Sequence, residues 1–104
     1  MNKVGTELDL NRLVYFRAIW QHRNISRAAE ALRVSQPAVS NALRELRSHF
    51  KDRLFVRCSG GVMPTPFAEK LATRIADALT ALERGLDIRE QFDPVINVQL
   101  GQGG

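Results

Sequence analysis

The sequence predicts a mainly α-helical fold, in which a winged helix-turn-helix head of three helices and a two-stranded wing precedes a long dimerising linker helix. Three observations support this prediction. Residues 25–50 read as two short helices joined by a tight turn, a strand-turn-strand pattern follows, and an uninterrupted helical pattern begins at Pro66. We therefore predict a head at residues 8–65, which contains a helix-turn-helix at about residues 25–44. A linker helix follows at residues 66–91, and a final segment at residues 92–104.

The composition is that of a small soluble domain. Hydrophobic residues make up 44% of the 104 residues and charged residues 25%. The apolar runs are too short to cross a membrane or to form a signal peptide, so we expect a cytoplasmic protein. Cys58 is the only cysteine and cannot form an intramolecular disulfide, and no metal-ligand spacing is present. We expect no metal and no cofactor in these residues.

The positive charge is concentrated in the head. Residues 1–65 hold 11 Lys and Arg against 5 Asp and Glu, a net charge of +6, whereas residues 66–104 hold 4 against 6, a net charge of −2. This asymmetry is typical of a head that binds a polyanion, although many soluble domains are mildly basic.

The first two helices are predicted from their caps and apolar spacing. Asp9 is a good N-cap, and the apolar residues after it recur at helical spacing. Ser26 is expected to cap the second helix. Ala28 and Ala29 then allow a neighbouring helix to cross closely, or they are simply good helix formers.

The third helix, residues 36–50, has two different faces. Ser35 is its expected cap and Pro37 lies in its first turn. At 100° per residue, four apolar side chains fall within about 60° of each other: Val39, Leu43, Leu46 and Phe50. The opposite face carries no acid and consists of Pro37, Ser40, Asn41, Arg44, Ser48 and Lys51. Such a helix suits insertion into a DNA groove.

The wing and the linker helix follow. Residues 54–57 have strand character, Ser59-Gly60-Gly61 is a turn signal, and residues 62–63 are the return strand. Thr65 caps the next helix, which would be about 37 Å long at 1.5 Å per residue. A small head cannot cover such a helix, so we expect its apolar stripe to dimerise; the alternative is a helix folded back on its own head. The expected dimerisation residues are Leu71, Ile75, Ala78, Leu79, Leu82 and Leu86.

The last residues predict the start of a further domain. Phe92-Asp93-Pro94 ends the helix, and Ile96, Val98 and Leu100 alternate with polar residues as in a strand. A single strand has no sheet to join here, so we expect the chain to be an N-terminal fragment cut just inside a further domain, with residues 92–104 disordered.

Several motifs in the right order resemble the LysR-type transcriptional regulators over roughly residues 8–86. They are Ala28-Ala29, Leu32, the run Ser35 to Ser40, Leu43, the LF-x-R strand of residues 54–57, and the Thr-Pro that starts the linker helix. Other segments, such as Phe92-Asp93-Pro94, are similar to a branch that contains nodulation and aromatic-degradation regulators. The chain departs from many relatives in having Asn41 in place of Arg and an uncharged wing tip.

The resemblance implies a sequence-specific regulator that binds inverted-repeat DNA sites as a dimer. Its partners would be double-stranded DNA, a second copy, further copies in a higher oligomer of the full-length protein, and a small-molecule effector bound by the absent domain. We expect bases to be read by Gln36, Pro37, Ser40 and Asn41. Phosphates would be bound by Ser35, Arg44, Arg47, Lys51, Arg53 and Arg57.

Two other classes of function compete with this one. An enzyme is not expected, because His22 and His49 lie in different helices without a nucleophile partner and no phosphate-binding glycine loop is present. A helical protein-interaction module would explain the long amphipathic helix equally well, but not the acid-free face of the third helix.

Overall fold

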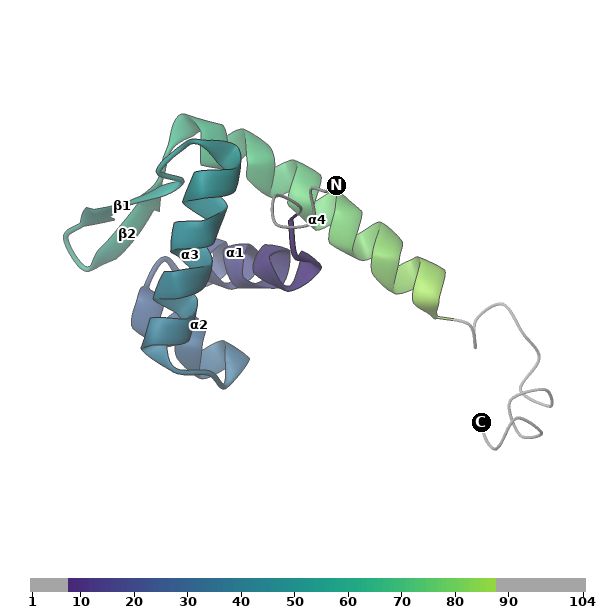
Figure 1. Ribbon diagram of the computed structural model, residues 1–104, viewed down its shortest axis with the longest axis horizontal. Helices are drawn as coiled ribbons and strands as arrows, with labels where there is room; N and C mark the ends of the chain where they lie inside the picture. Colours follow the sequence, from purple (N-terminus) through teal and green to yellow (C-terminus); the bar gives the residue numbers. More distant parts are fainter. Residues whose placement is uncertain (1–7, 88–104) are drawn as a thin grey trace, which may run out of the picture.

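The computed structural model describes residues 8–87 and has the predicted winged helix-turn-helix architecture. Its elements in chain order are α1 (Leu10–His22), α2 (Ile25–Leu32), α3 (Gln36–Phe50), β1 (Phe55–Cys58), β2 (Gly61–Pro64) and α4 (Pro66–Leu86). The two strands form an antiparallel hairpin on one side of α3, and α4 extends past the head on the other side (Figure 1). The predictions made for residues 88–104 lie outside the described residues.

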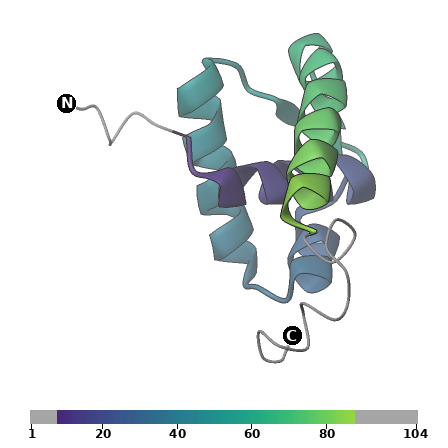
Figure 2. The same cartoon turned by 90° about the vertical axis from the view of Figure 1, so that its right-hand side faces the viewer.

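Helix α1 is the centre of the head. It contacts α2, α3 and α4, and it lies between α3 and α4 (Figure 2). The rings of Phe16 on α1 and Phe55 on β1 are both buried, with centroids 5.1 Å apart. Ala28 and Ala29 are buried where α2 packs against the core, as expected for a close helix crossing. The hairpin is therefore part of one hydrophobic core with the helices.

The helix starts follow the predicted caps in three cases out of four. The side chains of Asp9, Ser35 and Thr65 each accept a hydrogen bond from an amide of the helix that follows. The prediction for α2 is wrong, because its cap is Asn24 and not Ser26. Asn24 has an extended backbone and accepts from an amide in the first turn, which leaves the Ser26 hydroxyl available for another contact.

The junction between α3, β1 and α4 is held by one carboxylate. Asp52 Oδ1 accepts from the Leu54 amide and from the Thr65 hydroxyl, both at 2.7 Å. Leu54 is fully buried and has a left-handed backbone with φ of 67°. The strand therefore begins at Phe55, one residue later than predicted, and the Asp52 side chain links it to the first turn of α4.

The hairpin has a two-residue turn. Phe55 pairs with Pro64 and Cys58 with Gly61, so the turn is Ser59-Gly60 and Gly61 is the first residue of β2. The predicted turn included Gly61. An isolated hairpin is only marginally stable, and this one is supported from outside, since the Val62 amide donates to the Arg23 carbonyl at 2.9 Å.

The apolar stripe of α4 is divided between the head and solvent. Ala68, Ile75 and Leu79 are buried, because the first part of α4 packs on α1. The alternative of a helix folded back on its own head is therefore correct for this part, and Ile75 and Leu79 belong to the core rather than to an open surface. Three stripe residues beyond Ile75 remain exposed: Ala78, Leu82 and Leu86.

The C-terminal end of α4 also differs from the prediction. The helix ends at Leu86 with Asp87 as its cap, short of the predicted end at residue 91, and residues 88–91 lie outside the described part of the chain. Within residues 8–87, no helix combines the length and the apolar character that crossing a membrane requires.

Candidate nucleic-acid interface

The outward face of α3 is polar, exposed and free of carboxylates. Val39 and Leu46 are fully buried and hold the helix on the head. The residues on the opposite side are all exposed: Pro37, Ser40, Asn41, Arg44, Ser48 and Lys51. Glu45 lies beside this face and forms an ion pair with Arg12 of α1. The predicted division of α3 into an apolar and a basic polar face is confirmed.

The N-terminus of α3 adds a second feature that favours anions. The Ser35 side chain accepts from the Ala38 amide at 3.2 Å, and Pro37 lies in the first turn. The remaining amides of a helix N-terminus and its positive dipole end attract a phosphate group. No acidic residue lies in this first turn to compete with it. The start of α3 therefore suits a contact with the DNA backbone.

A polar cleft brings three of the predicted contact residues together. It has a volume of about 480 Å³ and lies between the N-terminal part of α3, the start of α2 and the hairpin. Gln36 and Ser40 line it from α3, and Arg57 lines it from β1. Asn41, Arg44 and Lys51 do not line this cleft, although they lie on the same outward face of α3. Two of the predicted base-reading residues and the predicted wing contact thus share one surface.

Two polar residues at the start of α2 also line this cleft, and our sequence reasoning assigned neither of them to the site. Ser26 Oγ accepts a hydrogen bond of 2.8 Å from Gln36 Nε2, which joins the two helices of the helix-turn-helix. Asn24 caps α2, and its Nδ2 lies 3.5 Å from the Gly60 carbonyl in the wing turn. The polar type of these residues was visible in the sequence, but their partners are 10 and 36 residues away.

The wing is fixed to the turn between α1 and α2. Arg23 has a left-handed backbone with φ of 54°, and its carbonyl accepts from the Val62 amide. Its guanidinium lies over the Trp20 ring, 4.5 Å from the centroid, while Nε donates to the Trp20 carbonyl at 2.7 Å. Gly61 passes so close that a Cβ there would lie 2.1 Å from the Arg23 oxygen. These contacts set the position of Arg57 relative to α3.

Arg47 has a structural role in place of the predicted phosphate contact. Its Nε donates to the Arg53 carbonyl and its Nη2 to the Phe55 carbonyl, both at 2.7 Å. Burial lowers the pKa of the Arg47 guanidinium, and the nearby charge of Arg53 lowers it further. Arg47 therefore ties the loop after α3 to the helix, whereas the predicted contacts Arg53 and Arg57 have exposed side chains.

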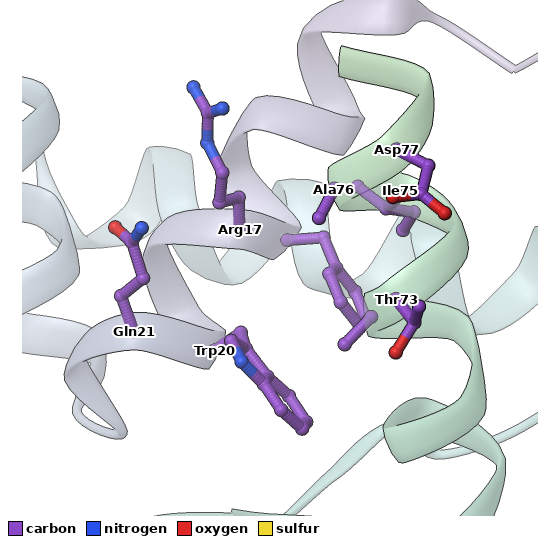
Figure 3. A pocket seen from close by; sticks show the side chains of 9 residues that line it. Arg17, Trp20, Gln21, Thr73, Ile75, Ala76 and Asp77 are labelled. Atoms are coloured by element: carbon purple, nitrogen blue, oxygen red, sulfur yellow. The ribbon is translucent and has the colours of Figure 1, made fainter. Parts of the chain in front are cut away.

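A second, mostly apolar groove lies between α1 and α4. It has a volume of about 360 Å³ and contains Phe16, Trp20 and Ile75 among its lining residues. Polar residues from both helices flank it, as Figure 3 shows for Arg17, Gln21, Thr73 and Asp77. None of the residues predicted to contact DNA lines this groove. It belongs to the side of the head that carries α4.

Comparison with known sequences supports the interpretation of this surface. A family model described as "Bacterial regulatory helix-turn-helix protein, lysR family" matches residues 10–69. The transcriptional activator NagR of a Ralstonia species is 47% identical over 88 residues, which are 85% of this chain and 29% of NagR. Nodulation protein D 1 of Bradyrhizobium elkanii is 41% identical over 90 residues, which are 86% of this chain and 29% of that protein. The chain thus spans less than a third of the length of these curated relatives.

Solved structures have the same arrangement of elements. A probable transcriptional regulator from Pseudomonas aeruginosa matches with a TM-score of 0.73 and 46% identity, over 77% of this chain and 27% of that one. The DNA-binding domain of BenM, solved in complex with a catB site, matches with a TM-score of 0.75 over 81% of this chain and 94% of that one. At 23% identity, the second likeness shows that the two chains share a fold.

Proposed function

Because the chain belongs to the lysR family of bacterial regulatory helix-turn-helix proteins, we propose that it is the DNA-binding part of a transcription regulator. The observation that carries this proposal is the exposed, carboxylate-free face of α3, which a buried stripe holds in place. A helix presented in this way can enter the major groove of double-stranded DNA. The relatives are regulators, so the chain is not an enzyme.

The proposed contacts divide into those that read bases and those that bind phosphates. The amides of Gln36 and Asn41 can pair with adenine, Ser40 can bond to several bases, and Pro37 can contact a thymine methyl. Affinity would come mainly from the phosphates. The proposed phosphate contacts are Ser35, Arg44, Lys51, Arg53 and Arg57, which are all exposed.

We also propose that two copies associate through α4. Leu82 is 39% exposed and Leu86 is 70% exposed, near the end of a helix whose first part is already packed on its own head. Apolar residues at helical spacing on an exposed face favour a partner helix. A symmetric dimer would prefer inverted-repeat sites with both half-sites on one face of the DNA. Sedimentation at high micromolar concentration tests this; a monomer there contradicts the proposal.

The remaining parts of the proposal depend on the family. The relatives are more than three times as long as the matched segment. We propose that a small-molecule effector acts through a domain outside residues 1–104, that the full-length protein forms a higher oligomer, and that it acts in the cytoplasm. A ligand screen and sedimentation on the full-length protein test the first two.

Selection of bound sequences from a random pool of double-stranded DNA tests the central proposal. We expect an inverted repeat to be enriched, because two copies would each present one α3. Binding of the selected site and of unrelated DNA is then compared at several salt concentrations. Both should weaken with salt, while the selected site stays preferred. A pool without any enriched sequence would contradict sequence-specific reading and favour a helical protein-interaction module.

A further inference from the structure

The hydrogen bond between Ser26 and Gln36 links a base-reading candidate to a residue outside the recognition helix. Ser26 lies in the first turn of α2 and is partly buried, and Gln36 is the exposed first residue of α3. Since Asn24 caps α2, the Ser26 hydroxyl is not needed for capping. It instead accepts from Gln36 Nε2 at 2.8 Å across the turn between the helices.

This bond fixes which groups Gln36 can present to DNA. A glutamine amide has two donor protons and one acceptor oxygen. With one proton given to Ser26, the outward edge keeps one donor and the oxygen Oε1. Adenine offers the matching pair in the major groove, an N7 acceptor and an N6 donor. Guanine offers two acceptors, N7 and O6, so one of them would face the glutamine oxygen without a proton between them.

We propose that Ser26 is the positioning residue that fixes the orientation of the Gln36 amide and thereby sets a preference for adenine over guanine. This inference rests on the proposed function, in which the start of α3 reads the major groove. Ser26 and Gln36 line the same polar cleft as Arg57, so the pair lies where the wing and the recognition helix meet. Without the bond to Ser26, the Gln36 side chain would lose conformational entropy on binding DNA. Its amide could also turn so that either its donor side or its acceptor side faces a given base.

The first test measures discrimination between two duplexes that differ by one adenine-to-guanine change at the position read by Gln36. Ser26→Ala should lower the ratio of the two affinities by about three- to tenfold, the effect of one ordinary hydrogen bond. Ser26→Thr keeps the hydroxyl and should retain the ratio. In the Gln36→Ala background, Ser26→Ala should change the ratio no further, because the group it positions is gone.

Two outcomes of this cycle would overturn the inference. One is that Ser26→Ala lowers the affinity for both duplexes equally, in the wild-type protein and in the Gln36→Ala background alike. Ser26 would then be a phosphate contact. The other is a ratio that Ser26→Ala leaves unchanged. Thermal unfolding of each variant separates these results from a folding defect, since only folded variants enter the cycle and Ser26→Thr supplies a second measurement of the same site.

A second test separates this inference from the proposed function. The side-chain amide signals of Gln36 in the free protein should shift in Ser26→Ala and return towards their original positions in Ser26→Thr. Signals that do not respond overturn the positioning role even where DNA binding is specific. If the signals respond but Gln36→Ala leaves the selected sequence unchanged, the bond exists and the assignment of base reading to Gln36 fails, which overturns the adenine preference as well.

Discussion

Replacing Gly61 by alanine tests whether the wing is fixed to the turn after α1. Gly61 has φ of +157°, and a Cβ built on it would lie 2.1 Å from the carbonyl oxygen of Arg23. The obstacle is a backbone atom, so no side chain can rotate away. The Arg23 carbonyl also accepts the hydrogen bond from the Val62 amide. The substitution should therefore push the hairpin away from the helices and break this bond.

The loss of stability has two parts, the strain of the backbone that has to accommodate the new Cβ and the broken hydrogen bond. An unfavourable backbone conformation costs about 1–3 kcal/mol, and the lost hydrogen bond costs about 0.5–1.5 kcal/mol. Together they predict a decrease of roughly 1.5–4.5 kcal/mol in the free energy of unfolding. For a domain of this size, the melting temperature should fall by roughly 6–36 °C.

Two glycines of the same chain serve as matched controls. Gly60 has φ of +86° with no atom within 4 Å of a built Cβ, so Gly60→Ala should cost only the backbone strain, about 1–2 kcal/mol. Gly85 lies in α4, also without a close atom, and Gly85→Ala should stabilise by about 0.5–1 kcal/mol. Urea unfolding of the three variants gives these differences. A Gly61→Ala variant no less stable than Gly60→Ala would refute the close approach of the wing to Arg23.

Four other substitutions test separate parts of the molecule. Arg47→Met should lower the free energy of unfolding by about 1–3 kcal/mol, because two carbonyls lose a charged donor; an unchanged urea midpoint would contradict its structural role. Asn41→Ala should lower the free energy of binding to the selected site by about 1–3 kcal/mol, through one base pair per half-site. Competition binding measures this, and an equal loss of affinity for random DNA would exclude base reading by Asn41. Arg44→Ala should reduce the slope of log affinity against log salt by about one unit; an unchanged slope removes it from the phosphate contacts. Leu82→Glu should shift the sedimentation profile towards the monomer, whereas the control Thr80→Glu should not. If the two variants sediment alike, the dimer surface lies elsewhere.

The sequence was sufficient for features that depend on neighbouring residues. Capping side chains act within one helical turn, so Asp9, Ser35 and Thr65 could be assigned directly. The two faces of α3 follow from a spacing that repeats within the helix itself. At the start of α2 the same reasoning named Ser26 as the cap, whereas Asn24, two residues earlier, has the extended backbone of a cap and accepts the hydrogen bond.

Features that depend on distant residues could not be predicted in this way. Arg47 lies at the edge of a basic helix face, and only the path of the loop after α3 shows that its donors face the carbonyls of Arg53 and Phe55. The apolar stripe of α4 likewise did not indicate how much of it the head would cover. Ile75 and Leu79 are buried because α1 lies beneath them, whereas Leu86 lies beyond the reach of α1.

The wing is anchored to the head at points that are separate from the residues of α3 proposed to read bases. The hairpin is attached at its base through the buried Phe55 and near its turn through the Arg23 carbonyl, which accepts from the amide of Val62, the cross-strand partner of Arg57. Neither attachment touches the outward face of α3, which the stripe around Val39 and Leu46 holds independently. A shifted wing should therefore weaken phosphate binding by Arg57 and leave the base preference of α3 in place. For that reason, Gly61→Ala at a temperature where it remains folded should lower affinity for selected and random DNA by a similar factor.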